Sequence, residues 1–393
     1  MEEKLMTDRK NATEKLYYKD GYMKEFTAEV VSCEKEKKGY RVVLDRTAFF
    51  PEGGGQFGDV GWIDDVRVLD TQEKEGIISH MTEAPFEVGA HVTGKLDFAE
   101  RFSRMQQHTG EHILSGIVHR LHGYDNVGFH LGAEVTTLDF NGELDEEQVR
   151  EVEVLANQAV FDNIQVNILY PSKEELQTLE YRSKIEIEGQ VRIVDIPGID
   201  RCACCAPHFS RTGEIGLIKI LACDKHRGGC RMTMVSGMRA LEDYRLKQKS
   251  VTDVSVALSA KPDKIGEAVV HQKEQMMKIR EHLNHLQESS LKQRLDEIKA
   301  EDSYVCIFVE DFDNIAVRNF VNDATERCSG ICGAFVGNDA NGYRYILGSK
   351  QKDVRELSKK LNEAFSGKGG GKPEMVQGSL TGTQEEILRM FES

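Results

Sequence analysis

Two short motifs, "HTGEH" at 108–112 and "CACCAPH" at 202–208, constrain the fold of this chain more than any other feature of its sequence. Histidines four residues apart on a helix lie on the same face and can share one metal ion. A cysteine thiolate with a further imidazole would complete a tetrahedral set that suits zinc. The four candidate ligands are His108, His112, Cys204 and His208. If they bind one ion, the fold must bring two distant segments together; otherwise the histidines are surface or capped residues.

A complete set of four protein ligands is typical of structural zinc, whereas catalytic zinc keeps one coordination position open. If the chain is a zinc-dependent enzyme, its four-ligand site therefore has two interpretations. Either one of the four ligands yields to water, or the zinc organises the pocket while another group positions the water. The neighbouring thiols of Cys202 and Cys205 are further candidates for the same site, and clustered cysteines in a reducing cytosol favour metal binding over disulfides.

"HTGEH" also fits H-x-x-E-H, the signature of a class of zinc proteases in which the glutamate between the histidines is the base. Glu111 would take that role here. Such sites use a carboxylate as a further ligand, whereas the second motif of this chain offers a Cys-x-x-x-His pair. A zinc metalloprotease is therefore the alternative enzyme interpretation, and cleavage of peptides would identify it.

Composition narrows the class of protein. No apolar run approaches the roughly 20 residues that span a membrane. The first residues, "MEEKLMTDRK", lack the layout of a signal peptide. We therefore expect a cytoplasmic protein without a membrane partner. The formal net charge of −15 argues against indiscriminate nucleic-acid binding but leaves room for local basic patches.

Hydrophobic patterns predict an α+β protein in four parts, of which the first two hold the motifs. From 1 to 100, segments such as "FTAEVVSCE", "YRVVLD" and "HVTGKLDF" predict a small β-barrel-like domain with a special glycine loop, "FFPEGGGQFGDVGWI". From 101 to 240 we expect an α/β zinc-containing domain. Its predicted elements are a helix from near Arg101 to Gly123, a helix over "DEEQVREVEVLANQAVFDN", and strands over "EVTTLDF", "VRIVDI", "GEIGLIKILAC" and "CRMTMVSG".

The other two parts are a helical linker and a small terminal domain. From 241 to 303 the chain is charged and nearly free of glycine, and Pro262 predicts a break between two helices of an αα-hairpin or short coiled coil. This linker is either a spacer or the interface of a homodimer. From 304 to 393 we expect a small α/β domain that ends in a second glycine loop, "SGKGGGKPEMVQGS". Its predicted strands are "YVCIFVEDF" and "YRYILGS", and its predicted helices are "IAVRNFVNDATER" and "VRELSKKLNEAF".

Four motifs, taken in order, resemble those of a known family. They are "LDRTAFFPEGGGQFGDVG" at 44–61, "QHTGEHILSG" at 107–116, "CCAPHFSRTGEIGLIKI" at 204–220 and the terminal "GKGGGKPEMVQGS". Together they make the chain similar to the alanyl-tRNA editing proteins of the AlaX type in their long form, which resemble the editing half of alanyl-tRNA synthetase. The resemblance covers nearly the whole chain, from about Thr13 to the end.

The resemblance implies a function. It implies a trans-editing hydrolase that deacylates tRNA(Ala) mischarged chiefly with serine, with glycine as a further candidate, and that has no ATP-dependent ligase activity. The family's zinc ligands fall on the four residues named above, and its DHH-associated domain, which contributes to tRNA binding and dimerisation, falls on 304–393. Where the family often has Cys-Gly-Gly-Thr-His, this chain has "CCAPH", so Cys205 could compete as a ligand. A zinc protein that binds tRNA without catalysis is the third interpretation.

The resemblance also implies roles for individual residues. Thr47 corresponds to the position whose hydroxyl senses serine, although composition alone favours an ordinary β-branched strand residue. Gly54 and Gly55 let the backbone approach a nucleotide closely. Gln56 can exchange hydrogen bonds with the ester or the terminal ribose. For the tRNA phosphates the candidate partners are Lys350, Lys352, Lys359, Lys360, Lys368 and Lys372, each of which a solvated surface would also explain.

Overall fold

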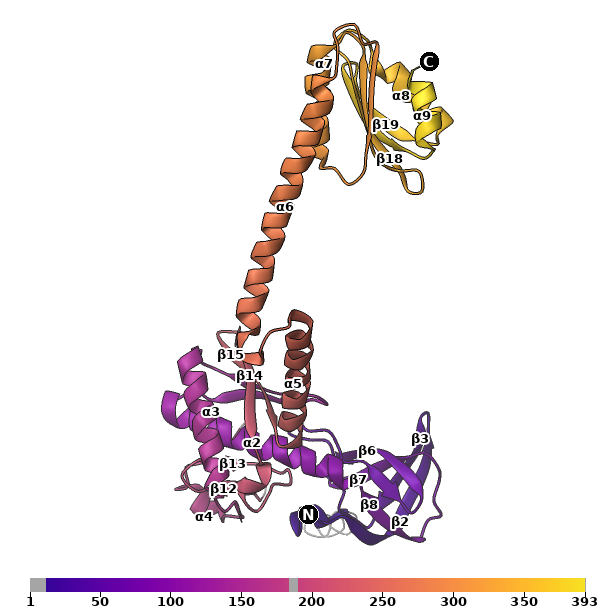
Figure 1. Cartoon of the computed structure of the whole chain (residues 1–393). Helices are drawn as coiled ribbons and strands as arrows, with labels where there is room; N and C mark the ends of the chain where they lie inside the picture. The colour runs from indigo at the N-terminus through magenta and orange to yellow at the C-terminus, as the bar shows by residue number, and fades with distance from the viewer. Residues whose placement is uncertain (1–11, 184–189, 393) are drawn as a thin grey trace. The chain divides into compact units, whose positions relative to one another are not determined.

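The computed structural model of this chain describes residues 12–183 and 190–392 (Figure 1). The chain divides into two compact units, Met1–Ser250 and Val251–Ser393, each with its own sheets and hydrophobic core. N-terminal sheets, a helical middle and a C-terminal sheet domain confirm the predicted mixture of helices and strands. Among the described helices, none is both long enough and apolar enough to cross a membrane.

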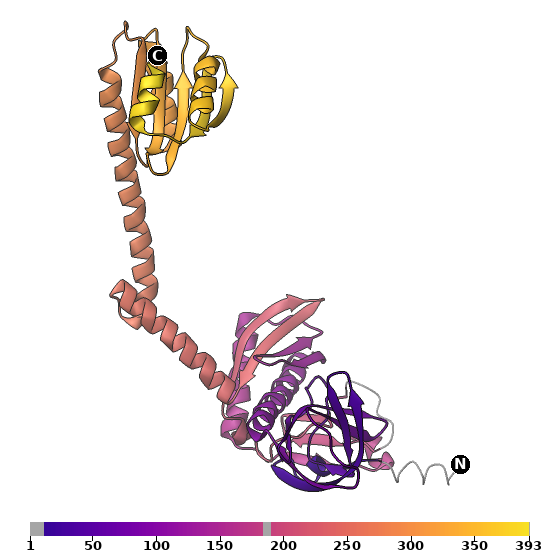
Figure 2. The ribbon, with the colours of Figure 1, turned by 90° about the vertical axis from the view of Figure 1, so that its right-hand side faces the viewer.

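The first part of the larger unit is a closed barrel of six strands in the order β2-β3-β7-β6-β5-β8, visible beside helix α2 in Figure 2. In β2 the residues at 26, 28 and 30 are buried and those between them exposed, which is the alternation that predicts a strand with one face in a core. The barrel strands are β2 Glu25–Glu36, β3 Gly39–Leu44, β5 Gly61–Ile63, β6 Val66–Lys74, β7 Ile77–Thr82 and β8 His91–Leu96.

Helix α2, Phe98–His122, leads from the barrel into the second part of this unit. The side chain of Asp97 accepts a hydrogen bond from the amide of Glu100 and caps the first turn. Gly123 ends the helix with φ of 70°, a left-handed conformation that favours glycine. The predicted end at Gly123 is therefore confirmed. Short elements outside the barrel order precede α2: the parallel pair β1 Glu14–Lys15 and β4 Arg46–Thr47, and the 3₁₀ turn η1 Leu16–Tyr18.

The second part packs helices against two antiparallel sheets. One sheet has the order β14-β15-β10-β9 and the other β11-β12-β13. Of the apolar residues whose spacing predicts α2, Ile113, Leu114, Ile117 and Val118 are fully buried in the core of this part, whereas Leu121 is 41% exposed. Its elements are β9 Asn126–Leu131, β10 Thr136–Phe140, α3 Glu146–Phe161, β11 Asn167–Leu169, α4 Lys173–Leu176, β12 Ile193–Ile196, β13 Asp200–Ala203, η2 Thr212–Ile215, β14 Ile218–His226 and β15 Gly229–Ser236.

One strand prediction is wrong at its start. The strand predicted over "GEIGLIKILAC" begins only at Ile218, because the preceding residues form the 3₁₀ turn η2. Gly216 has φ of 84° and redirects the chain between the two elements. Two helices follow, as predicted: α5 Met238–Leu258 and α6 Ile265–Asp296, and Pro262 opens the turn η3 Pro262–Lys264 between them. The αα-hairpin and the finer domain boundaries stay predictions.

The smaller unit is a mixed five-stranded sheet in the order β16-β17-β18-β20-β19, with helices on both faces (Figure 1). Cys332, Ala334 and Val336 of β17 pack toward α7 and the end of α6, whereas Phe335 packs with α8 and α9. The elements are β16 Tyr304–Val309, α7 Asn314–Arg327, β17 Ile331–Asn338, β18 Gly342–Gly348, α8 Val354–Ala364, β19 Lys368–Lys372, β20 Met375–Leu380 and α9 Gln384–Phe391.

The second glycine loop is not a loop, so that prediction is wrong. Lys368–Lys372 is the strand β19, which pairs antiparallel with β20 at the edge of the sheet. A Cβ atom on Gly369 would lie 2.5 Å from the hydroxyl oxygen of Tyr345 and 2.6 Å from the carbonyl oxygen of Gln377. Glycine is therefore needed here because the strand lies directly against its neighbours, and not because the chain turns.

A buried ion pair joins the barrel part to α2. Arg101, 1% exposed, donates from Nε to Asp59 Oδ2 at 2.9 Å, and Asp59 is 2% exposed. Its other guanidinium nitrogens donate to the carbonyl oxygens of Gly21 at 3.0 Å and Ala48 at 2.7 Å. Asp59 also accepts from the amide of Phe50 at 2.6 Å. Because the charges are paired and hydrogen-bonded, the pair tolerates burial and holds the first glycine loop, between Phe50 and Asp59, near the helix.

We predict that Arg101→Met lowers the free energy of unfolding of the larger unit by about 3–5 kcal/mol, because Asp59 stays buried without its main partner. Urea denaturation followed by circular dichroism measures the change. The matched control is Arg41→Met, because Arg41 pairs with Glu36 at 3.0 Å with both side chains 43% exposed. Loss of such an exposed pair should change stability by no more than about 1 kcal/mol. Equal losses in both variants would contradict the structural role of Arg101.

Candidate metal centre

The four candidate ligands meet at one place. The ligand atoms of His108, His112, Cys204 and His208 all lie within 4.8 Å of one another. Cys204 Sγ is 3.6 Å from His108 Nε2 and 3.3 Å from His208 Nε2. A tetrahedral zinc ion with bonds of about 2.3 Å to sulfur and about 2.0–2.1 Å to nitrogen places its ligand atoms about 3.3–3.6 Å apart. The spacing of these residues therefore fits one shared ion.

A hydrogen bond on the far side of each imidazole orients the ring. His108 Nδ1 lies 2.9 Å from Gln56 Oε1, and His112 Nδ1 lies 2.9 Å from Asp200 Oδ2. His208 Nδ1 lies 3.2 Å from the hydroxyl of Thr109. With Nδ1 engaged in each ring, Nε2 is the nitrogen that remains for an ion. Such outer hydrogen bonds fix the tautomer and the ring orientation of metal-binding histidines.

The protonation of these groups also suits a metal. Burial is the main cause that holds the pKa of His208 well below its usual value, so the ring is neutral and can bind a cation. Burial raises the pKa of Cys204, which favours the thiol until a cation is present to stabilise the thiolate. Burial also acts to raise the pKa of Asp200, but hydrogen bonds from His112 and Arg182 outweigh it and keep the carboxylate ionised.

A second group of candidate ligands is less suited to an ion. His112, Asp200 and Cys202 also come together, but the carboxylate of Asp200 accepts hydrogen bonds from Arg182 Nε at 2.7 Å and Arg182 Nη2 at 2.9 Å, besides the one from His112. These donors occupy the carboxylate oxygens that a metal would need. Cys205 belongs to neither group among the described residues. Asp200 and Arg182 lie in no motif, and their role is visible only from their proximity in the fold.

The first glycine loop docks onto the metal centre. Gly54 and Gly55 have φ of 61° and 84°, in the left-handed region that glycine adopts without strain. A Cβ atom on Gly55 would lie 2.4 Å from the carbonyl oxygen of Phe129, and the amide of Leu131 donates to the carbonyl oxygen of Gly55 at 2.9 Å. The loop therefore lies flat against β9, and this contact brings Gln56 to His108.

Thr47 is fully buried, and its hydroxyl already has partners. Its Oγ1 lies 2.9 Å from His80 Nε2 and accepts from the amide of Phe49 at 3.1 Å. Nδ1 of His80 lies 3.2 Å from the carbonyl oxygen of Val42. Burial lowers the pKa of His80 to about 4, so the ring is neutral near pH 7. Because Nδ1 faces a carbonyl, it carries the ring proton, and the hydroxyl of Thr47 donates to Nε2.

Glu111, between the two histidines of α2, is buried in a network of hydrogen bonds. Its Oε1 accepts from Ser115 Oγ at 2.8 Å and from Asn126 Nδ2 at 2.6 Å. Its Oε2 is 3.8 Å from His112 Nε2. The carboxylate therefore braces α2 against β9, and the four ligands assembled next to it include a thiolate in place of the carboxylate that the protease interpretation requires.

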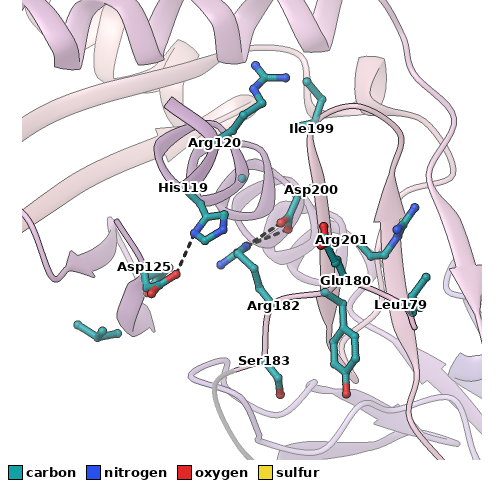
Figure 3. A pocket seen from close by; sticks show the side chains of 14 residues that line it. His119, Arg120, Asp125, Leu179, Glu180, Arg182, Ser183, Ile199, Asp200 and Arg201 are labelled. Atoms are coloured by element: carbon teal, nitrogen blue, oxygen red, sulfur yellow. Dashed lines mark hydrogen bonds and ion pairs between the residues drawn. The ribbon is translucent and has the colours of Figure 1, made fainter. Parts of the chain in front are cut away.

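A cavity of about 1020 Å³ lies on the outer side of the site, next to Asp200 (Figure 3). Its walls come from the end of α2, the start of β9 and residues 179–183. In Figure 3 the side chain of Arg182 reaches Asp200, and His119 reaches Asp125 at 2.9 Å. Because Asp200 also bonds His112, the cavity is separated from a candidate metal ligand by one side chain.

The six predicted tRNA-binding lysines all lie exposed in the smaller unit. Lys350 pairs with Glu326, and Lys359 lies 3.9 Å from Glu363. The ammonium group of Lys352 is 5.3 Å from the centre of the Tyr304 ring. Lys368 and Lys372 stand at the two ends of β19. Ion pairing with nearby carboxylates makes Lys350 and Lys359 the weaker candidates for phosphate contact.

Three family models match parts of the chain. They describe tRNA synthetases of class II (A) over residues 1–100, the threonyl and alanyl tRNA synthetase second additional domain over residues 191–233, and the DHHA1 domain over residues 301–393. The second match contains the Cys204–His208 half of the metal centre. The third covers the sheet of the smaller unit, so the matches follow the same order along the chain as the parts of the fold.

Individual relatives resemble more of the chain. The alanyl-tRNA editing protein Aarsd1 of Mus musculus is 27% identical, over 93% of this chain and 94% of the relative. The alanine–tRNA ligase of Ignicoccus hospitalis is 29% identical over 92% of this chain, which spans 40% of the ligase. The alanyl-tRNA editing protein AlaX-L of Pyrococcus horikoshii is 30% identical, over 95% of this chain and 96% of the relative. Because this last likeness runs through almost the whole of both chains, the protein belongs to the alanyl-tRNA editing proteins of the AlaX type, in their long form.

Proposed function

We propose that this chain hydrolyses the ester bond of tRNA(Ala) mischarged with serine and, as a second substrate, with glycine. It acts in trans, on tRNA that another enzyme has charged, and does not ligate amino acids. The observation that carries the proposal is the cluster of three imidazoles and a thiolate, which touches the glycine loop through Gln56, in a family whose named members edit alanyl-tRNA. An aminoacyl ester is already activated, so positioning and charge stabilisation suffice for its hydrolysis.

We propose zinc as the ion of this site, because imidazole and thiolate donors with tetrahedral spacing suit it. When bound, zinc can polarise an oxygen of the substrate or lower the pKa of a water. The protein holds the donors in place through Gln56, Thr109 and Asp200. The backbone of Gly54 and Gly55, which is exposed, can approach the terminal nucleotide of the tRNA.

The contacts of Thr47 suggest how serine is recognised. Since its hydroxyl donates to His80 and its oxygen accepts from Phe49, the only hydrogen-bonding capacity left to Thr47 is as an acceptor. An acceptor at this position favours a substrate side chain that donates. Serine has a hydroxyl that can donate, whereas alanine has none, so Thr47 would distinguish the wrong amino acid from the right one.

Two other functions make different predictions. A zinc metalloprotease would cleave peptides and would leave charged tRNA intact. A non-catalytic protein would bind tRNA without releasing the amino acid. Incubation with serine-charged and alanine-charged tRNA(Ala), with a denatured peptide substrate in parallel, separates the three. The absence of a carboxylate from the four clustered ligands favours the hydrolase over the protease.

Metal content gives a direct test of the zinc proposal. Elemental analysis of the purified protein should find about one zinc per chain. Cys204→Ala should lower both zinc content and the rate of serine release, because it removes the thiolate of the set. The matched control is Cys205→Ala, since Cys205 is exposed and outside the cluster. Full zinc occupancy in Cys204→Ala, or loss of zinc in Cys205→Ala, would contradict the ligand assignment.

Thr47→Val should slow the release of serine, because the substrate hydroxyl would then be buried without an acceptor, at a cost of about 1–3 kcal/mol in the barrier. Release of alanine should stay level or rise, so the two rates converge. Single-turnover assays measure both rates without interference from product release. Thr47→Ser is the matched control, because it keeps the hydroxyl. An equal fall in the rates of serine and alanine release would contradict this role and would mean that Thr47 only supports the fold.

For the smaller unit we propose contact with tRNA phosphates through exposed lysines. Lys368→Glu together with Lys372→Glu should weaken tRNA binding and flatten its dependence on salt, because fewer counterions are released. Fluorescence anisotropy over a series of salt concentrations measures both effects. The control carries Lys37→Glu and Lys38→Glu in the barrel, which changes the net charge equally. If the two double variants bind alike, net charge and not local contact explains the change.

We further propose that the chain forms a homodimer through α6. Val269, Met276, Ile279, Leu283 and Leu286 are 48–69% exposed and follow the heptad spacing of a coiled-coil seam. A seam of this kind buries its apolar stripe against a second helix of the same pattern. Light scattering on the protein and on both lysine variants should therefore give the mass of two chains.

A further inference from the structure

The side chain of Gln56 has one amide atom in use and one without a partner. Gln56 is 1% exposed, and its Oε1 lies 2.9 Å from Nδ1 of His108. Its Nε2 is buried and has no hydrogen-bond partner among residues 12–183 and 190–392. A buried donor left unpaired costs about 1–3 kcal/mol. Native proteins keep few such atoms, and each one calls for an explanation.

The chemistry of His108 fixes which way this amide points. Nε2 of His108 faces Cys204 Sγ at 3.6 Å and belongs to the metal cluster. A neutral imidazole that offers Nε2 to a cation carries its proton on Nδ1 and must donate from there. Of the two amide atoms of Gln56, only Oε1 can accept that proton. The reverse orientation would set two donors against each other, so Nε2 is the atom left over.

The backbone around Gln56 gives the amide little freedom to turn away. The backbone amide of Gly53 donates to the carbonyl oxygen of Gln56 at 3.0 Å, and the backbone amide of Gln56 donates to the carbonyl oxygen of Gly53 at 3.1 Å. Gly55 lies flat on Phe129. A rigid donor, without a protein partner and beside a metal ligand, is arranged as a group that stabilises negative charge on a substrate oxygen.

We infer that Gln56 has two roles: Oε1 positions His108, and Nε2 donates a hydrogen bond to the carbonyl oxygen of the aminoacyl ester. The inference rests on the proposed function of the chain as an ester hydrolase. As water adds to the ester carbon and gives up a proton, the carbonyl oxygen takes up negative charge, and the hydrogen bond from Nε2 strengthens. When that intermediate collapses, the electron pair on this oxygen re-forms the carbonyl double bond, the bond from carbon to the ribose oxygen breaks, and the ribose oxygen takes up the proton that the water gave up. Gln56 keeps its own protons throughout.

Two substitutions separate the roles. Gln56→Glu keeps an acceptor for His108 but has no donor, whereas Gln56→Met has neither. Gln56→Glu should bind zinc as the unmutated protein does and should hydrolyse serine-charged tRNA(Ala) about 10²–10³-fold more slowly in single-turnover assays. Gln56→Met should show the same loss of rate and should also bind zinc about 10–100-fold more weakly, because His108 loses its outer partner.

Zinc affinity is measured by competition with a chelator, and the absorption spectrum of the cobalt-substituted protein reports the geometry of the ligands. If Gln56→Glu hydrolyses the ester at the full rate, Nε2 is not the donor. If Gln56→Met binds zinc normally, Oε1 does not position His108. An unmutated protein that hydrolyses no charged tRNA would overturn the proposed function and the donor role with it, while the zinc measurements would still decide the positioning role.

A second substrate identifies which oxygen accepts the hydrogen bond from Gln56 Nε2. In tRNA that ends in 2′-deoxyadenosine and carries serine on the 3′ oxygen, the ester carbonyl is present and the neighbouring hydroxyl is missing. If Nε2 bonds the carbonyl, the ratio of the unmutated rate to the Gln56→Glu rate should stay at about 10²–10³ on this substrate. A ratio near one would assign the bond to the ribose hydroxyl and overturn the carbonyl assignment.

Discussion

The buried contact between Arg101 and Asp59 is the interaction on which the geometry of the candidate metal centre depends. Arg101 belongs to the helix that carries His108 and His112, and Asp59 follows the glycine loop that carries Gln56. The pair fixes the distance between the two, so that Gln56 reaches His108. The barrel part therefore reaches the candidate metal centre through the position that this ion pair gives its loop.

Much of the architecture could be predicted from local patterns. Alternation of polar and apolar residues predicted β2, a run of β-branched residues predicted β3, and the apolar spacing around Ile113 predicted α2. The four clustered ligands followed from their spacing within two short motifs, because each half of the set lies within one turn of chain. In these cases the deciding contacts lie close together in the sequence, where periodicity and ligand spacing can be seen.

What could not be predicted depends on single residues that meet across the fold. Asp200 and His112 are 88 positions apart, and no motif surrounds Asp200. Gln56 lies in the first motif, but nothing in that motif indicates its contact with His108, 52 positions away. The glycines of β19 predicted a turn, because flexibility is their usual role. Gly369 instead packs closely against Tyr345 and Gly371 against Met375, which only the assembled sheet reveals.

The position of β19 has a consequence for how the chain behaves in a crowded solution. An edge strand offers an open row of backbone groups to which a strand of another molecule can add. The three glycines at the centre of β19 would make it an especially easy template, because no bulky side chain stands in the way. Lys368 and Lys372 bracket this template with like charges that a second copy would also carry. Whatever else these lysines bind, they repel self-association at the one edge where glycine makes it easiest.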